Sequence, residues 1–421
     1  MNLYIKNIEI VLTVVSKLQK NLYFEKKIEN FKDPKKAWET LYEALNKPKS
    51  KKSQIDSIEI DDVNVSDPQQ IADQFNSYFS SVADLYLNKI PSTKTTHNDF
   101  PSKVVSSSFE FKAVDHNVIQ KVINNLESKV SCDINGFSSK LLKECSEFII
   151  KPLTHLVNLS LSHGIFPCEL KISRTCPIFK SGCRKKVVNY RPIACLPVIS
   201  KVFEKVVFNQ LFEYLTVNNI LSPNQFGFQP GKSTLHPLIH MLNYIAEAFN
   251  QNKFVVGVFL DLSKAFDLVS HDILLSKLEK IGLNARSLSW FKSYLTDRKM
   301  FTSVNGFLSS SSKKLLRSVP QGSILGPLLF LIFVNDMPLS NNLDCFLFAD
   351  DTSALTSGND IQLTGAFVNT EIQMLGLWLR SHELSINTTK SKVMIFSNIR
   401  VVPDFHLFLA LMILTAQLTL T

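Results

Sequence analysis

The sequence predicts an α+β fold, and two kinds of segment support that prediction. Two apolar runs, residues 255–260 and 345–349, are short and rich in strand-forming side chains, as buried strands are. Other segments, such as residues 67–88, repeat apolar side chains at helical spacing. The chain has 421 residues, of which 45% are hydrophobic. It is therefore long enough for two or more domains and apolar enough for a substantial core.

The first 170 residues predict helices joined by polar linkers. A helix around Trp38 runs into a basic linker at 46–53, which Pro48 breaks. Asp67 and Pro68 begin the helix at 67–88, because an N-cap followed by proline is a typical helix start. The remaining segments of this part are a polar loop at 91–108 and helices at 118–126 and 139–161.

Strands and helices mix in the rest of the chain. Ser200 is predicted to cap an amphipathic helix that extends to Leu215, and Gly282 to close a helix at 272–281. The apolar run 328–334 is compatible with a helix or a strand. The other predicted elements are a strand at 174–179, paired strands at 300–305 and 313–319, a helix at 371–379 and a strand at 392–396.

Two adjacent aspartates, Asp350 and Asp351, follow the apolar run 345–349. A solvated acidic pair normally has polar neighbours, whereas these two are attached to a strand predicted to be buried. Unpaired carboxylates next to a buried strand are costly in free energy, and binding of a divalent cation usually offsets that cost. For the pair alone, a turn or a solvated loop end is the alternative interpretation.

A third carboxylate follows the other apolar run, because Asp261 comes directly after residues 255–260. If the two strands lie side by side in one sheet, three oxygen donors converge. Such a set suits Mg²⁺ or Mn²⁺ and does not suit zinc. Two such ions roughly 3.5–4 Å apart clamp an in-line phosphoryl displacement. The sequence therefore predicts a two-metal site.

Three further motifs bear on nucleotide binding. Gln321 and Gly322 lie in a loop with two glycines and two prolines, where a ligand can approach the main chain; an ordinary loop before a buried helix is the alternative. Lys180 and Arg191 flank a basic turn that suits a triphosphate. The segment 225–234 contains Gly-Lys-Ser, but Phe226 stands where an ATP-binding phosphate loop requires glycine, so we reject an ATPase.

The charge balance favours a nucleic-acid partner. Lys and Arg number 46 against 37 Asp and Glu, although an excess that only aids solubility is the alternative. The seven cysteines lack CxxC spacing and a histidine cluster, which argues against structural zinc and for reduced thiols inside a cell, in the cytoplasm or the nucleus. No signal peptide is evident, and the apolar run 407–414 is too short to predict a membrane span.

The order of these motifs resembles that of the reverse transcriptases of non-LTR (LINE-type) retrotransposons. The resemblance covers roughly residues 30–397, including upstream blocks at 75–79 and 164–167 and a downstream block at 384–392 near Trp378. The central blocks are Asn-Tyr-Arg-Pro-Ile (189–193), Gln-Phe-Gly-Phe (225–228), Leu-Asp-Leu-Ser-Lys-Ala-Phe-Asp (260–267), Val-Pro-Gln-Gly-Ser (319–323) and Phe-Ala-Asp-Asp (348–351).

The resemblance implies a right-hand polymerase with fingers and palm, in which helices back an antiparallel palm sheet. Such an enzyme copies an RNA template into DNA from a DNA primer and dNTPs, with Mg²⁺ or alternatively Mn²⁺, and no obligate protein partner is evident. By motif position, Asp261, Asp350 and Asp351 are the metal-binding carboxylates, and Leu262 belongs to the metal-binding positions.

The resemblance also implies roles around the nucleotide. Phe266 stands where the family has a steric gate that excludes a ribose 2′-OH, with simple core packing as the alternative. The other positions are Lys180 and Arg191 at the triphosphate, Gln321 and Gly322 beside nucleotide and template, and Lys390 as a catalytic general acid near the leaving pyrophosphate. The implied domains are an N-terminal helical extension with linker (1–110), associated helices (111–170), fingers and palm (171–397) and an unmatched apolar tail (398–421).

The chain also departs from the family pattern. Ser318 and Gln229 replace an expected glycine and arginine, and Cys183 replaces an expected aspartate. After Phe396 no helical thumb is evident, so we expect the thumb to be missing or incomplete. A truncated or frame-shifted element, or a mis-joined gene model, explains the tail better than a membrane anchor. The lead hypothesis has two rivals. One is a catalytically inactive nucleic-acid-binding remnant, and the other is a related polymerase such as an intron-encoded maturase, against which the upstream blocks argue.

Overall fold

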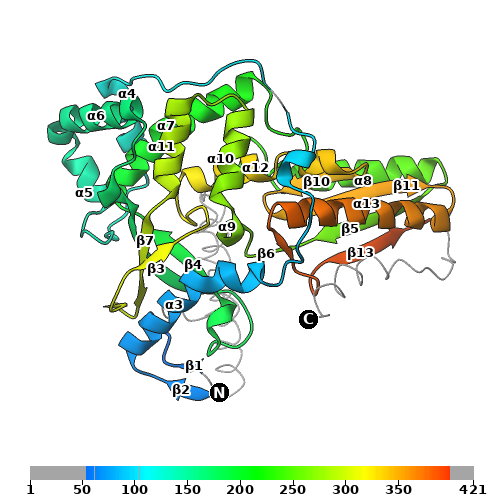
Figure 1. The fold of residues 1–421 in the computed structure, drawn as a ribbon, viewed down its shortest axis with the longest axis horizontal. Coiled ribbons are helices and arrows are strands. Elements are labelled where there is room, and N and C mark those ends of the chain that lie inside the picture. Colours follow the sequence, from blue (N-terminus) through cyan, green and yellow to red (C-terminus); the bar gives the residue numbers. More distant parts are fainter. Residues whose placement is uncertain (1–53, 61, 104, 399–421) are drawn as a thin grey trace, which may run out of the picture. The chain divides into compact units, whose positions relative to one another are not determined.

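The computed structural model describes residues 54–60, 62–103 and 105–398 (Figure 1). The chain divides into two compact units, Met1–Asp56 and Ser57–Thr421, and the fold described below belongs to the second. That unit mixes helices and sheets, so the predicted α+β class is confirmed. The predicted helix around Trp38, the basic linker at 46–53 and the apolar run 407–414 lie outside the described residues.

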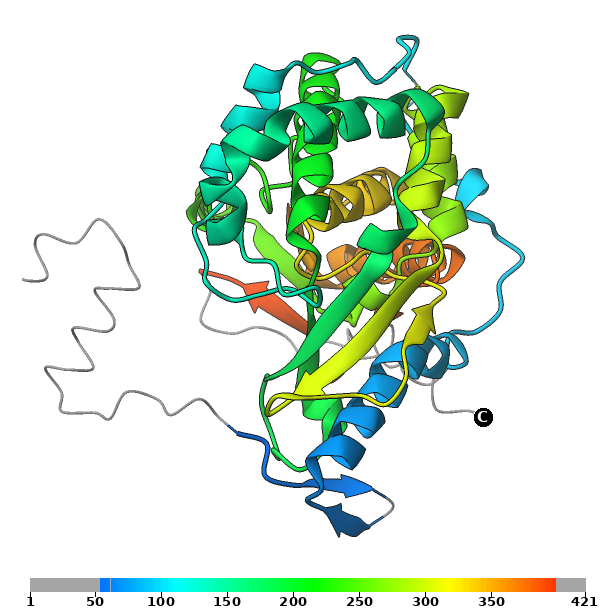
Figure 2. The ribbon, with the colours of Figure 1, turned by 90° about the vertical axis from the view of Figure 1, so that its left-hand side faces the viewer.

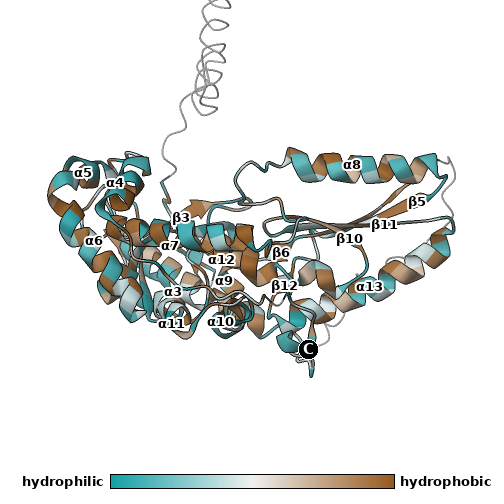
Figure 3. Cartoon of the chain, turned by 90° about the horizontal axis from the view of Figure 1, so that it is seen from above, coloured by the Kyte–Doolittle hydropathy of each residue, from teal (hydrophilic) through white to brown (hydrophobic). Residues whose placement is uncertain are grey.

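One antiparallel sheet carries the three aspartates identified in the sequence. Its strand order is β10 (Asp344–Phe348), β11 (Asp351–Gly358), β5 (Phe254–Leu260) and β13 (Lys392–Phe396). The helices α8 (Leu235–Asn250) and α13 (Ile361–Ser381) lie on opposite faces of this sheet (Figure 3). Both predicted strands exist, but they are not neighbours, because β11 separates β10 from β5.

A second sheet joins segments from different parts of the chain. Its strands are β4 (Tyr190–Cys195), β3 (Ile172–Phe179), β7 (Arg298–Val304), β8 (Phe307–Leu308) and β9 (Lys313–Leu315), and β3 pairs with β7 in parallel. Helix α3 (Pro68–Leu87) runs alongside this sheet (Figure 2). The predicted start of α3 is confirmed, since the side chain of Asp67 accepts a hydrogen bond from the Gln70 N–H. The strand predicted at 313–319 is shorter, because it ends at Leu315.

Seven helices of the described residues pack together beside the sheets. They are α4 (His116–Asn125), α5 (Ser139–Glu144), α6 (Ser146–His163), α7 (Val198–Val217), α10 (His271–Lys280), α11 (Ala285–Leu295) and α12 (Leu325–Val334). The ambiguous run 328–334 is thus helical. The helix predicted at 139–161 is interrupted at Cys145. The predicted cap at Ser200 is wrong, because Pro197 occupies the N-cap position and Ser200 is buried inside α7. Among the described helices, none combines the length and the apolarity needed to cross a bilayer.

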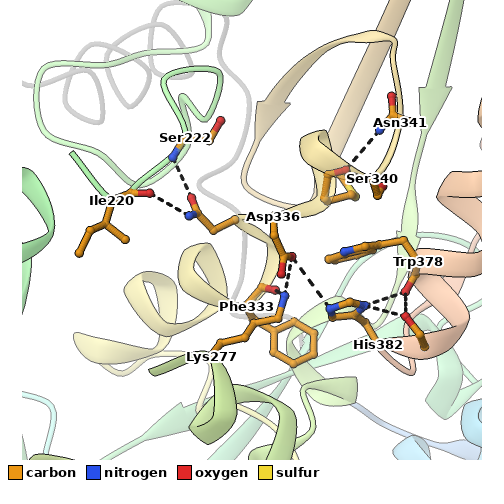
Figure 4. Close-up of polar contacts among 12 residues, drawn as sticks. Ile220, Ser222, Lys277, Phe333, Asp336, Ser340, Asn341, Trp378 and His382 are labelled. Atoms are coloured by element: carbon orange, nitrogen blue, oxygen red, sulfur yellow. Dashed lines mark hydrogen bonds and ion pairs between the residues drawn. The ribbon is translucent and has the colours of Figure 1, made fainter. Parts of the chain in front are cut away.

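A buried ion pair ties three helical segments together (Figure 4). The Lys277 Nζ lies 2.6 Å from Asp336 Oδ1 and donates to the Phe333 carbonyl at 2.6 Å. The ring of His382, which follows α13, stacks on Trp378 with centroids 3.9 Å apart, and its Nε2 lies 4.0 Å from the same carboxylate oxygen. Burial lowers the pKa of Lys277 to about 8, and Asp336 opposes this shift.

We expect Lys277→Ala to destabilise the protein by about 3–5 kcal/mol, because removing one partner leaves the buried Asp336 carboxylate without its counter-charge. Urea denaturation followed by circular dichroism measures the loss. Lys292→Ala, at an exposed position of α11, is the matched control and should change stability by less than about 0.5 kcal/mol. Equal effects in the two variants would show that the buried pair contributes nothing specific.

Candidate active site

The acidic pair lies in a tight turn between β10 and β11. Phe348 pairs with Asp351, so Ala349 and Asp350 form a two-residue hairpin turn. Ala349 has a φ of 58°, the left-handed conformation that tight hairpins require. Asp350 therefore sits at the tip of the hairpin and Asp351 begins β11.

Gln225 and Gly227 hold this turn from a distant part of the chain. The buried Gln225 side chain accepts hydrogen bonds from the N–H groups of Ala349, at 3.0 Å, and Gly227, at 2.8 Å. The main chain at Gly227 packs so closely that a Cβ there would lie 2.2 Å from the Ala349 nitrogen. Only glycine fits this contact, which explains the spacing of the Gln-Phe-Gly-Phe motif.

Strand pairing brings Asp351 and Asp261 to the same end of one ladder. The last pair of the β11–β5 ladder is Thr352 with Leu260, and Asp351 and Asp261 are the residues directly beyond it. Both line the same cavity, and the charge of Asp261 acts on the pKa of Asp351. Asp261 is fixed further by its main chain, since its N–H donates to Ser391 Oγ at 3.2 Å and its carbonyl accepts from the Asn387 N–H at 2.8 Å. The first and third acidic positions are thus held by the sheet.

The three carboxylates interact electrostatically. The pKa of Asp351 is raised, first by partial desolvation and then by the charges of Asp350 and Asp261. Lys390 acts in the opposite direction on that pKa, and its Nζ lies 3.6 Å from Asp261 Oδ2. An open cavity of about 650 Å³ is lined by Asp261, Asp351 and Lys390.

Lys180 joins the same charged cluster. The pKa of Lys180 is lowered, chiefly by burial and then by Arg191 and Lys390, whereas Asp261 raises it. Lys180 and Arg191 lie side by side on the β3–β4 hairpin, because Ile178 pairs with Arg191 and the Lys180 N–H donates to the Asn189 carbonyl at 2.8 Å. The structure therefore brings three of the predicted basic residues to the edge of the acidic group.

The convergence of the carboxylates is only partial. Within the described ranges, no group of three or more His, Cys, Asp or Glu side chains is close enough to hold a metal ion as it stands. The donor chemistry nevertheless fits a hard divalent cation, which binds carboxylate oxygens and would offset the desolvation and the repulsion that raise the pKa of Asp351. Leu262, in β6 (Leu262–Ser263), has an apolar buried side chain, so only its carbonyl could serve as a ligand.

Phe266 lies in the short helix α9 (Ala265–Leu268) beside this site. Its ring stacks on Phe330 with centroids 4.6 Å apart and meets Phe228 edge-on at 6.0 Å. The ring is half-buried and packs against the main core. Both the steric gate and simple core packing thus have a structural basis, since part of the Phe266 ring packs against the core and part stays exposed.

Gln321 and Gly322 lie against β4. The Ala194 N–H donates to the Gln321 carbonyl at 2.8 Å, and Gly322, with a φ of +112°, is so close that a Cβ would lie 2.5 Å from the Ala194 oxygen. The Gln321 side chain donates to Asp267 Oδ1 at 2.9 Å. The amide is therefore bound to a carboxylate, and does not point freely into the cavity beside Asp261.

Asp267 is buried, and its second oxygen has no hydrogen-bond partner in the described part of the chain. Burial raises the pKa of Asp267 from 3.8 to about 6, while Lys264 and the hydrogen bond from Gln321 lower it. The folded protein therefore holds a proton there that the unfolded chain releases at lower pH.

We expect this group to make stability fall as pH rises from about 4 to about 6, by up to roughly 3 kcal/mol, and to contribute no slope above that range. Asp267→Asn keeps the acceptor for Gln321 and removes the titration. The measurement is urea denaturation at a series of pH values, wild type against variant. Parallel curves for the two proteins would contradict the assignment.

Several residues of the site carried no role in the sequence interpretation. Gln225, Asp267 and Ser391 hold the turn, the Gln321 side chain and the Asp261 main chain, respectively. All three lie inside blocks that the sequence showed, but their partners are distant in the chain. Only Asp267, between Phe266 and Leu268, has the local signal of a polar residue among apolar neighbours.

Comparisons with known proteins agree with this geometry. Residues 183–407 match the family model described as reverse transcriptase (RNA-dependent DNA polymerase). The chain belongs to the reverse transcriptase family. The resemblance to enzymes of non-LTR retrotransposons is also confirmed by the relatives. The match extends to residue 407, past the boundary predicted at 397.

The relatives come from mobile elements of insects. The chain is 31% identical to "Probable RNA-directed DNA polymerase from transposon BS" of Drosophila melanogaster, over 68% of this chain and 32% of that protein. It is 29% identical to the RNA-directed DNA polymerase from mobile element jockey of the same species, over 69% of this chain and 32% of the relative. The chain thus spans about a third of the length of these relatives. Reverse transcriptases generally use divalent metal ions.

Proposed function

We propose that this reverse transcriptase chain is an RNA-directed DNA polymerase module of a non-LTR retrotransposon, which transfers a nucleotide from a dNTP to a primer 3′-OH. The observation that supports this best is the position of Asp351 and Asp261 together at the end of the β11–β5 ladder, with Asp350 at the adjoining hairpin tip. Family membership and basic neighbours support the same activity, because a polyanionic substrate must approach three carboxylates.

In this proposal the sheet of β10, β11, β5 and β13, with α8 and α13, is the palm. The sheet of β4, β3 and β7 belongs to the fingers, and residues 111–170 form associated helices. An antiparallel sheet with helices on its faces supports the palm assignment. The expected missing or incomplete thumb stays a prediction, because the chain after Asn398 lies outside the described residues.

The site residues have complementary roles. Asp261, Asp350 and Asp351 would hold Mg²⁺ or Mn²⁺, with the Leu262 carbonyl as a further ligand. Two such ions, when bound, supply activation of the attacking hydroxyl and stabilisation of the leaving group.

Basic and aromatic side chains would position the nucleotide. Lys180 and Arg191 neutralise the triphosphate, and Lys390 protonates the leaving pyrophosphate as a general acid. Phe266 faces the sugar as a steric gate. Gly322 lets the loop lie close to nucleotide and template, and Gln321 supports that loop through Asp267.

Primer extension by the purified chain tests the proposal. An RNA template with an annealed DNA primer should be extended by dNTPs in the presence of Mg²⁺ or Mn²⁺, and chelation should stop the reaction. Salt-sensitive binding of the duplex without extension would instead identify an inactive nucleic-acid-binding remnant. If the chain neither binds nor extends the duplex, both functions are overturned.

A further inference from the structure

Glu204 of α7 is a fully buried carboxylate to which the sequence assigned no role. One oxygen, Oε1, accepts a hydrogen bond from the Ser200 hydroxyl at 2.7 Å. The other, Oε2, accepts from the N–H groups of Ile324, at 2.7 Å, and Leu325, at 3.3 Å. Burial raises the pKa of Glu204, and Ser200, the charge of Arg298 and the two N–H groups act against that shift.

These two N–H groups belong to the start of α12, whose N-cap residue makes no capping bond of its own. Ile324 occupies the N-cap position, its side chain makes no capping hydrogen bond, and the first turn carries no acidic residue. A helix begins with N–H groups that need partners outside the helix, and a negative charge there is favourable. Ser323 Oγ accepts a hydrogen bond from the Gly326 N–H at 2.8 Å, and the distant Glu204 accepts from the two N–H groups before it.

The loop before α12 is the one that contacts the proposed nucleotide site. The Val319 N–H donates to the Phe266 carbonyl at 3.1 Å, and Gln321 is bound to Ala194 and Asp267. Further along α12, the ring of Phe330 supports the ring of Phe266. Glu204 fixes the point where the loop and the helix meet. It therefore helps to hold both Val319 and Phe330 in contact with Phe266.

We propose that Glu204 is a positioning residue for nucleotide selection, which acts by anchoring the start of α12 and the loop that precedes it. The inference rests on the proposed polymerase function. Glu204 touches neither nucleotide nor metal position. Its loss should therefore change how well the correct nucleotide is bound and discriminated, more than how fast a bound nucleotide reacts.

The test compares Glu204→Gln with Glu213→Gln, an exposed position of the same helix. Glutamine keeps the volume but replaces one of the two acceptor oxygens by an NH2 group, so we expect KM for dNTP in single-nucleotide extension to rise about tenfold and kcat to change by less than about threefold. The preference for dNTP over rNTP should fall in the same variant. Ser200→Ala removes one of the three hydrogen-bond partners of Glu204, so it should change KM and the dNTP preference in the same direction but by less. This variant replaces Glu204→Gln in the test if Glu204→Gln does not fold.

Hydrogen–deuterium exchange separates this inference from the proposed function. The amides of Ile324 and Leu325 should exchange at least about tenfold faster in Glu204→Gln than in wild type, whether or not the protein extends a primer. An active wild type with unchanged KM and selectivity in Glu204→Gln would overturn the positioning role. Unchanged exchange at the two amides would overturn the anchor itself, and an inactive wild type with faster exchange would contradict the polymerase proposal alone.

Discussion

Asp350→Asn should reduce nucleotide incorporation by roughly 10³-fold or more, while leaving the fold at least as stable as that of wild type. The loss of activity follows because one of the three carboxylates proposed to hold the metal ions disappears, which costs several kcal/mol of transition-state stabilisation. The gain in stability follows because Asp350 adds to the negative charge that raises the pKa of Asp351. Single-nucleotide extension and thermal unfolding measure the two effects, and their opposite signs distinguish lost chemistry from misfolding.

Asp344→Asn is the matched control for this experiment. Asp344 is exposed at the first position of β10, on the same hairpin as Asp350. The variant carries the same chemical change and should retain wild-type incorporation. Comparable activity in Asp350→Asn and Asp344→Asn would show that the hairpin tip is not part of the catalytic site.

Phe266→Ala should lower the preference for dNTP over rNTP by at least about tenfold, because the side chain that would collide with a 2′-OH is removed. Stability should fall as well, by roughly 2–3 kcal/mol, since the ring stacks on Phe330 and is half-buried. The ratio of kcat/KM for the two nucleotides measures selectivity, and urea denaturation measures stability.

Phe228→Ala removes the ring that meets Phe266 edge-on and is 50% exposed, so it controls for a general loss of aromatic contacts. We expect it to keep the dNTP preference. If Phe266→Ala loses stability but keeps its selectivity, the residue is a core side chain and not a gate.

The sequence predicted the elements whose signal is local. The strands β5, β10 and β13 are continuous apolar runs, and α3 begins with an Asp-Pro start that the structure confirms. By contrast, β11 was missed because its residues, Asp-Thr-Ser-Ala-Leu-Thr-Ser-Gly, are mostly polar or small. That omission matters, because β11 is the strand that aligns Asp351 with Asp261.

What could not be predicted depends on contacts between distant residues. The Gln225–Ala349 hydrogen bond spans 124 residues, and the bonds from Glu204 to α12 span 120 and 121. No periodicity in a single sequence encodes such a partner. The error at Ser200 has the same origin, since a serine before an apolar stripe suggests a cap, whereas here its hydroxyl serves the buried Glu204.

The support of Asp261 by Ser391 has a consequence for the order of folding. That hydrogen bond closes a loop of 130 residues, and the partner of Asp261 on the other side, β11, also arrives late in the chain. Contacts of such long sequence separation form slowly, because the entropy of loop closure is lost before they contribute. The surroundings of Asp261 therefore cannot be complete until the segment around Ser391 has joined them, whichever part of the chain folds first.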